Sequence, residues 1–345
     1  MKAKIAPSYD VNREPLRNII PLNTPFTIFI EPTRLCNFKC FYCLHSTRGI
    51  VGGELDKTGY KLKNMEMELY EKILRDMQKF PQKPKRIVYS GLGEPLINNN
   101  LPEMIKMAKA MKIAERLDVL TNASLLTEKL TDDLISSGVT RIQISLQGLS
   151  SQKYKDVSNI DLDYHKFIEN IKYLYNNRKQ CKVFIKIIDA LLENDEDKDG
   201  FFKVFGEMSD QIYIEHLITL QHQMGNHNGK ADDSKNLNNE PVIYRNVCPV
   251  IFYMLQIDVD GNVFPCPVSG LPKYFSIDNI KLQDLNEIWK GETRRAFLLN
   301  HLKLHRDRIP VCNSCNACSC VLDKNEYLDD YAEEIKKRII IEENE

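Results

Sequence analysis

Residues 31–43 read EPTRLCNFKCFYC and hold three cysteines within eight positions, namely Cys36, Cys40 and Cys43. The stretch overlaps the end of a short apolar run, Thr27–Glu31, which the pattern predicts to be a buried strand. Three thiolates on one loop can hold a cube-shaped iron–sulfur cluster by three corners and leave the fourth iron open, as a catalytic site requires. A zinc site completed by His45 is the alternative, and it is disfavoured because zinc ligands usually come as two separate short pairs.

Outward from this stretch, the sequence alternates between apolar runs and amphipathic segments. Six runs rich in Ile, Val and Phe predict buried strands: Thr27–Glu31, Arg86–Ser90, Leu117–Thr121, Arg141–Leu146, Lys182–Ile188 and Gln211–Glu215. Helical patterns separate them: Met65–Lys79, Leu101–Ile113, Thr127–Ser137, Tyr164–Asn177 and Asp197–Met208. In the third helix Thr127 is the expected N-cap, and Gly138 follows its end. The alternation predicts an α/β fold of six parallel βα units, two fewer than a full eight-fold barrel.

With these features the sequence resembles the radical S-adenosylmethionine (radical SAM) family. The family's signature is three cysteines with spacings of three and two residues, in the loop after the first strand of a partial barrel. An aromatic residue, here Tyr42, precedes the third cysteine. The resemblance implies a partial (β/α)6 TIM-like barrel, a [4Fe-4S] radical cluster on the three cysteines, and S-adenosyl-L-methionine (SAM) as cofactor. In this family, reductive cleavage of SAM gives a 5′-deoxyadenosyl radical that removes hydrogen from a substrate C–H bond.

Three further segments resemble the family's SAM-binding motifs in the same order. Residues 90–95, SGLGEP, are similar to the Gly-Gly-Glu-Pro segment that holds the methionine amino group. Residues 120–122, LTN, and 144–148, ISLQG, are similar to segments that meet the SAM carboxylate and ribose. The resemblance implies these cofactor-binding residues: Tyr42, Gly91, Gly93, Glu94, Pro95, Asn122, Ser145 and Gln147. Departures from the family pattern occur at Leu92, Ala123 and Gln147. All these segments end predicted strands, where βα barrels build active sites.

A second group of cysteines lies near the end of the chain, at Cys248, Cys266, Cys312, Cys315, Cys318 and Cys320. The polar segment Met224–Asn239 before it is expected to be a linker. Two apolar runs, Leu255–Asp258 and Asn262–Pro265, flank an Asp-Gly turn and predict a β-hairpin. A helix from about Leu282 to His301 and a terminal helix over Tyr327–Glu345 are expected to follow. By geometry alone, four of the cysteines fit either a zinc ribbon or an iron–sulfur cluster.

The hairpin, helix and cysteine-rich loop resemble the SPASM/Twitch group of radical SAM enzymes, in which a small α+β cluster-binding domain follows the barrel. The resemblance favours one auxiliary [4Fe-4S] cluster, held by Cys248, Cys266, Cys312 and Cys315. Either Cys318 or Cys320 could replace Cys315, and a second auxiliary cluster lacks obvious ligands. The expected organisation is an N-terminal arm (1–25), the barrel (26–225), a linker (226–241), the auxiliary-cluster domain (242–325) and a C-terminal helix (326–345).

The amino-acid composition argues against several further classes of function. The chain has 345 residues, of which 43% are hydrophobic and 28% charged, as in an ordinary globular protein. Its 47 Lys plus Arg against 48 Asp plus Glu give a net charge of −1, which is not the basic footprint of a duplex nucleic-acid binder. No signal peptide and no membrane-spanning apolar run is apparent. We therefore expect a cytoplasmic protein without nucleic-acid or membrane partners, whose ten cysteines are metal ligands or reactive thiols.

Two reactions fit the resemblance. In the first, an alcohol of a small polar, carbohydrate-like metabolite is oxidised, and the auxiliary cluster accepts an electron. We expect this dehydrogenase-like oxidoreductase, because peptide-modifying members often carry a leader-binding domain before the barrel and only about 25 residues precede the first strand here. In the second, a peptide is cross-linked or epimerised. A non-catalytic zinc-binding protein is the remote alternative.

The residues that would complete the reaction are less defined by the sequence. Candidates for a hydrogen donor or base are Cys318, Cys320 and Glu215, with His216 and His222 near the end of the sixth strand. A lone histidine in such a place is more often structural than catalytic. By resemblance, a low-potential electron donor such as flavodoxin or ferredoxin is the expected protein partner.

Overall fold

The computed structural model describes residues 1–8, 13–220, 224–225, 227, 229–320 and 323–341. Its centre is a ten-stranded sheet in the order β1-β7-β6-β5-β4-β3-β2-β8-β9-β10. The strands are β1 (Lys4–Ile5), β2 (Thr27–Ile30), β3 (Arg86–Tyr89), β4 (Arg116–Thr121), β5 (Arg141–Leu146), β6 (Lys182–Ile188), β7 (Gln211–Glu215), β8 (Met254–Ile257), β9 (Asn262–Phe264) and β10 (Asp278–Asn279). Strands β2 to β7 pair parallel with their sequence neighbours.

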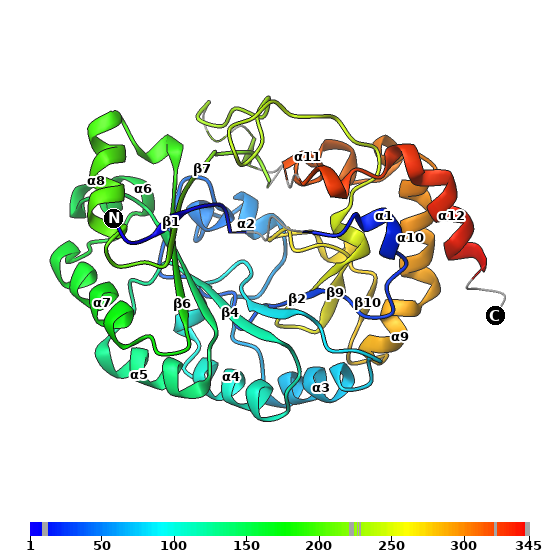
Figure 1. Cartoon of the computed structure of the whole chain (residues 1–345), viewed down its shortest axis with the longest axis horizontal. Coiled ribbons are helices and arrows are strands. Elements are labelled where there is room, and N and C mark those ends of the chain that lie inside the picture. Colours follow the sequence, from blue (N-terminus) through cyan, green and yellow to red (C-terminus); the bar gives the residue numbers. More distant parts are fainter. Residues whose placement is uncertain (9–12, 221–223, 226, 228, 321–322, 342–345) are drawn as a thin grey trace.

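Helices cover the outside of this curved sheet (Figure 1). In chain order they are α1 (Leu16–Ile19), α2 (Glu54–Lys57), α3 (Met67–Met77), α4 (Leu101–Ala110), α5 (Glu128–Ser137), α6 (Ser151–Ser158), α7 (Tyr164–Asn177), α8 (Asp195–Phe205), α9 (Leu285–Lys290), α10 (Glu292–Leu302), α11 (Ala317–Cys320) and α12 (Ala332–Ile341). The apolar strand faces and the inner faces of α3, α4, α5 and α7 form one buried core. The six predicted strands and the α/β class are confirmed.

Local sequence signals explain where several helices begin and end. The Thr127 hydroxyl accepts the Leu130 amide at 3.1 Å, and Gly138 ends α5 with a left-handed φ of 94°. Both caps were predicted from the sequence. Helix α6 was not predicted, because SQKYKDVS has little apolar periodicity. Its caps are nevertheless regular: the Ser150 hydroxyl accepts the Lys153 amide at 3.2 Å, and Asn159 is left-handed.

The structure differs from the expectations made from the sequence in three places. The single helix expected over 282–301 is two helices, α9 and α10, because the backbone of Gly291 is extended (φ −67°, ψ 159°) between them. The terminal helix begins at Ala332, after a 3-10 turn, rather than at Tyr327 as expected. Strand β1 was not predicted, since two residues carry no periodicity; it extends the sheet beside β7.

The auxiliary hairpin continues the barrel sheet. Strand β8 pairs parallel with β2, with Thr27 opposite Met254 and Ile30 opposite Ile257, and β9 returns antiparallel. The turn between β8 and β9 places Gly261 at φ 87°, a left-handed conformation that favours glycine. The hairpin is confirmed, and its first strand sits directly beside the strand that leads into the first cysteine loop.

A second apolar core holds the end of the chain against its beginning. It joins buried residues of α1, of the segment before β8, of α10 and of α12. The N-terminal segment therefore reaches from β1, at the barrel edge, to α1 beside α12 (Figure 1). The polar segment expected to be a linker also packs on the protein, because the Leu237 carbonyl accepts the His216 amide at 3.0 Å.

Candidate active site

The first cysteine loop leaves the carboxyl end of β2 and turns tightly. The Cys43 amide donates to the Cys40 carbonyl at 2.9 Å, and the Cys40 thiol lies 3.3 Å from the Ser158 hydroxyl. Burial raises the pKa of the Cys36 and Cys40 thiols to about 12. Buried thiols with such pKa values become thiolates only when a strong positive charge such as bound iron compensates, so the loop fits a metal cluster.

The Gly-rich segment after β3 lies directly against this loop. The Glu94 amide donates to the Leu35 carbonyl at 2.8 Å. A Cβ atom on Gly93 would lie 2.3 Å from the Thr33 carbonyl oxygen, and one on Gly91 would lie 2.5 Å from Cγ of Glu31. Such distances are impossible for real side chains, so both positions require glycine for close backbone approach. Leu92, the departure from the family pattern, is buried in a small cluster with Leu44 and Leu55.

The carboxylate of Glu94 is buried and accepts three hydrogen bonds. It accepts hydrogen bonds from the Thr121 hydroxyl at 2.5 Å, the Asn122 amide at 2.7 Å and the Leu96 amide at 3.1 Å. Burial raises the pKa of Glu94 to about 7, although these hydrogen bonds act in the opposite direction. The ends of β3 and β4 are thus tied together at the mouth of the barrel.

A cavity of about 230 Å³ joins these elements. It contains the three loop cysteines and most of the residues that the resemblance assigned to SAM: Cys36, Cys40, Tyr42, Cys43, Gly91, Gly93, Glu94, Asn122, Ser145 and Gln147. The Tyr42 hydroxyl donates to the Gln147 side chain, so the departure at Gln147 provides a partner for the aromatic residue. Pro95 does not line this cavity and begins a short 3-10 turn behind Glu94.

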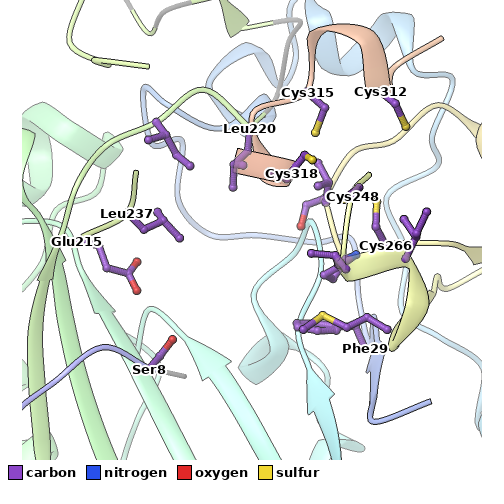
Figure 2. A pocket seen from close by; sticks show the side chains of 18 of the residues that line it. Ser8, Phe29, Glu215, Leu220, Leu237, Cys248, Cys266, Cys312, Cys315 and Cys318 are labelled. Carbon is purple, nitrogen blue, oxygen red and sulfur yellow. The ribbon is translucent and has the colours of Figure 1, made fainter. Parts of the chain in front are cut away.

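The second cysteine group surrounds a larger cavity of about 490 Å³. Figure 2 shows five cysteines on its wall: Cys248, Cys266, Cys312, Cys315 and Cys318. Cys318 lies with the four predicted ligands, and its thiol donates to the Arg245 carbonyl at 3.6 Å. The side chain of Cys320 lies outside the described residues. Burial raises the pKa of Cys315 to about 11 and that of Cys266 and Cys312 further, so this group too fits a metal cluster that holds thiolates.

The two cavities share part of their walls. Tyr42, Cys43, Gly91, Lys186 and Ile188 line both of them. Lys186 on β6 forms an ion pair with Glu215 at the end of β7, and both side chains are largely buried. Figure 2 places Glu215 across the larger cavity from the cysteines. A substrate in this space would therefore lie between the two cysteine groups.

The two candidate histidines near β7 and the candidate Glu215 have different places in the structure. His216 Nδ1 lies 2.5 Å from Asp189 Oδ2, and its Nε2 lies 2.9 Å from the Asp232 carbonyl. Both ring nitrogens are occupied, so the structural interpretation of His216 fits better than a role as base. His222 lies outside the described residues. Glu215 lines the cavity as expected.

Sequence reasoning missed several polar residues that the structure brings to the site. Lys186 interrupts the apolar run of β6, a visible signal that was not used. Arg34 and His301 were missed because each contacts a residue that is distant in the sequence. Arg306 was missed although Cys312 and Cys315, whose carbonyls it contacts, are close in the sequence. Arg34 pairs with Glu31, Asp258 and Asp260, whereas His301 and Arg306 line the cavity beside the second cysteine group.

Two family models match the chain. One, the radical SAM superfamily, covers residues 30–203, and the other, the SPASM iron–sulfur cluster-binding domain, covers residues 248–319. For the C-terminal cysteines, the second match supports an iron–sulfur site rather than a zinc site. No helix in the described part of the chain is long and apolar enough to cross a membrane.

Individual relatives support the same family over different lengths. A probable GTP 3′,8-cyclase of Methanococcus vannielii is 33% identical over 138 residues, which are 40% of this chain and 41% of that protein. The chain therefore matches about two fifths of the length of such relatives. Two solved structures share the fold. BtrN in complex with AdoMet and 2-DOIA has a TM-score of 0.58 at 18% identity, covering 88% of this chain and 97% of BtrN. Streptococcus suis SuiB bound to S-adenosylmethionine has a TM-score of 0.60 at 17% identity, covering 92% and 79%.

The superfamily model spans half of the residues, including the cysteine loop and the Gly-rich segment whose close approach was described above. This chain belongs to the radical SAM superfamily, with SAM and a [4Fe-4S] cluster as cofactors and a SPASM domain for auxiliary iron–sulfur binding.

Proposed function

We propose that the chain oxidises an alcohol carbon of a small metabolite that binds in the larger cavity. The observation that carries this proposal is the shared wall of the two cavities, which gives one substrate access to both cysteine groups. When bound, SAM and the radical cluster supply a 5′-deoxyadenosyl radical, and the auxiliary cluster supplies an electron acceptor. The protein's own part is to bind the substrate, orient it and exclude water.

Residue roles in this proposal follow the geometry. Cys36, Cys40 and Cys43 hold the radical cluster. The residues around the smaller cavity hold SAM, with Pro95 directly behind Glu94: Tyr42, Gly91, Gly93, Glu94, Asn122, Ser145 and Gln147. Four cysteines of the second group hold one auxiliary [4Fe-4S] cluster, with Cys248, Cys266, Cys312 and Cys315 as the first choice. Cys318 is then a fifth thiol on the same wall.

The Lys186–Glu215 pair is the proposed polar anchor for the substrate. Oxidation of an alcohol to a carbonyl removes one hydrogen atom, one proton and one electron. The Glu215 carboxylate would accept the proton, and the Lys186 ammonium would hold the oxygen from which it leaves. Lys186 lines both cavities, so a substrate held by its ammonium would have the reacting carbon near the SAM side.

The apolar part of the cavity favours one further candidate. Four side chains form an apolar wall above the polar pair, namely Leu217, Ile218, Leu220 and Leu237. This wall would receive an apolar face of a metabolite, and it equally suits an apolar side chain of a peptide. SuiB, whose fold is similar, has been solved with a precursor peptide. Peptide cross-linking or epimerisation is therefore the second candidate.

Deuterium transfer tests the proposal. Anaerobically reconstituted protein should contain about eight irons per chain, for two cubane clusters. Candidate alcohols and peptides deuterated at carbon are then incubated with SAM and a flavodoxin or ferredoxin as electron donor. Deuterium in 5′-deoxyadenosine together with a carbonyl product supports alcohol oxidation. Transfer from peptides alone favours the second candidate, and protein that binds only zinc contradicts both.

Two variants serve as controls for this experiment. Replacing the three loop cysteines by alanine should abolish SAM cleavage. Glu215→Gln should preserve deuterium transfer but reduce carbonyl formation, because the carboxamide cannot accept the proton. Equal carbonyl formation by Glu215→Gln and by the wild type would remove Glu215 from the proposed role.

A further inference from the structure

Two buried side-chain nitrogens of residues beside the auxiliary cysteines have no hydrogen-bond partner among the described residues. The cavity walled by the five cysteines is also lined by His301 and Arg306. Within the described part of the chain, His301 Nε2 and Arg306 Nε are buried atoms that make no hydrogen bond. An unpaired buried N–H is costly, so such a donor usually has a partner that is absent from the protein itself.

The tautomer of His301 follows from its other nitrogen. The Cys248 amide donates to His301 Nδ1 at 3.4 Å, which makes Nδ1 an acceptor and leaves the ring hydrogen on Nε2. The imidazole is fully buried, and the Phe297 ring packs edge-on against it at 5.0 Å. The ring is therefore held in one orientation, with an N–H donor beside the cavity that the second cysteine group lines.

Arg306 brings a positive charge to the same place. Its Nη1 donates to the carbonyls of Cys312 and Cys315, at 2.9 and 2.8 Å. The guanidinium also lies 5.2 Å from the centre of the Tyr244 ring, and the side chain is almost completely buried. These contacts fix the guanidinium against the Cys-x-x-Cys loop, and they leave Nε free to donate to an acceptor inside the cavity.

We propose that Arg306 and His301 donate hydrogen bonds to sulfur atoms of the auxiliary cluster and raise its reduction potential. Hydrogen bonds to sulfur and nearby positive charge both stabilise the reduced, more negative form of an iron–sulfur cluster. This inference deepens the proposed function, since an electron acceptor works only if its potential is high enough to take the electron. Both residues are positioning residues in this proposal, because they would act through the cluster.

The chain offers matched variants. Arg306→Gln removes the charge, whereas Arg306→Lys keeps it. His301→Asn keeps an acceptor near the Nδ1 position and removes the Nε2 donor, whereas His301→Gln keeps a donor near Nε2. Arg308→Gln removes the same charge from an exposed position of the same 3-10 turn and is the control.

The test measures the auxiliary cluster alone. All variants are made in the full chain with Cys36, Cys40 and Cys43 replaced by alanine, reconstituted anaerobically, and titrated by electron paramagnetic resonance at controlled potential. No substrate is present, so the result does not depend on whether alcohol oxidation is the reaction. Arg306→Gln should shift the oxidised-to-reduced ratio at least tenfold toward the oxidised form, which is a midpoint lower by about 59 mV for one electron. His301→Asn should give a shift of about threefold in the same direction.

Conservative variants and cluster content decide the remaining outcomes. Arg306→Lys and His301→Gln should stay closer to the parent midpoint than their partners, and Arg308→Gln should match the parent. Unchanged midpoints in Arg306→Gln and His301→Asn, with full iron content, would overturn the proposal. If Arg306→Gln loses its cluster, the midpoints of His301→Asn and His301→Gln decide whether the proposal holds. Loss of the cluster in all four variants but not in Arg308→Gln would show a purely structural role and also overturn it.

Discussion

Replacing Arg34 by Met should loosen the joint between the radical-cluster loop and the auxiliary hairpin. The Arg34 guanidinium is almost fully buried and donates to three carboxylates: to Glu31 at 3.1 Å, Asp258 at 2.6 Å and Asp260 at 2.5 Å. Glu31 in turn accepts the Leu92 amide at 2.7 Å, within the Gly-rich segment. One side chain therefore links β2, the segment after β3 and the β8–β9 turn.

The size of the effect follows from burial. Methionine has a similar length but no charge, so the variant leaves two buried carboxylates, Glu31 and Asp258, without their cation. Removing one partner of a buried ion pair costs about 3–5 kcal/mol. Asp260 adds little, because its side chain is 37% exposed and water screens it. We expect the local opening free energy around this network to fall by about 3–5 kcal/mol at pH 8.

The effect should depend on pH through Glu31. Burial raises the pKa of Glu31 to about 7, and Arg34 acts against that rise. A carboxyl group whose pKa is higher in the folded than in the unfolded protein reduces the stability of the fold. The reduction grows as the pH rises from the unfolded pKa, near 4.5, to the folded pKa. Without Arg34 the Glu31 pKa rises further, and the neutral acid persists to higher pH. The difference between wild type and variant should therefore be smaller at pH 6 than at pH 8.

Native-state hydrogen exchange measured by mass spectrometry tests this reasoning. Peptides that contain residues 90–95 and 257–262 should exchange at least a hundredfold faster in Arg34→Met, since about 1.4 kcal/mol corresponds to tenfold. Arg178→Met is the matched control. Its bidentate pair with Asp210, at 3.1 Å for both contacts, is partly exposed and should cost about 1 kcal/mol locally. Equal exchange of the two peptides in both variants would refute the network as a joint.

Three further predictions concern the cavities. Gly93→Ala should weaken SAM binding at least tenfold in calorimetry, because its Cβ would meet the Thr33 carbonyl. Gly200→Ala, whose Cβ meets open space in α8, should raise the melting temperature slightly and leave binding unchanged. Cys248→Ala should lose about four of the eight irons. Cys181 is a buried thiol directly before β6, and Cys181→Ala should keep all of them. Full iron content in Cys248→Ala would exclude Cys248 as a ligand. Lys186→Met should reduce deuterium transfer without changing the iron count, and Lys186→Arg should restore part of it; normal transfer in Lys186→Met would contradict its role as anchor.

The parts of the fold that the sequence predicted depend on neighbours along the chain. The run Lys182–Ile188 predicts a strand because five of its seven residues are apolar, and Thr127 predicts a helix start because its hydroxyl reaches an amide three residues away. The cysteine spacing predicts a shared ligand site for the same reason. Each of these signals is complete within a short window of sequence.

The parts that were missed depend on pairs far apart in the chain. Arg34 meets Asp258 across 224 positions, and no local pattern marks either residue as a partner. Cys318 was expected as a substitute ligand or a hydrogen donor, because the sequence does not show that α11 brings its thiol to the same cavity wall as Cys248. The break between α9 and α10 is different, since Gly291 is visible in the sequence and was passed over.

The pairing of β2 with β8 fixes the position of the second cysteine group relative to the first. Strand β2 ends at the loop of Cys36, and the hairpin that β8 begins ends near Cys266. A slip of one residue in this parallel register would turn the buried faces of β8 toward the wrong side, which the apolar core of Leu255 and Ile257 opposes. The Arg34 pairs close the same joint at its carboxyl end. The spacing of the two cysteine groups therefore depends on strand register rather than on a flexible linker.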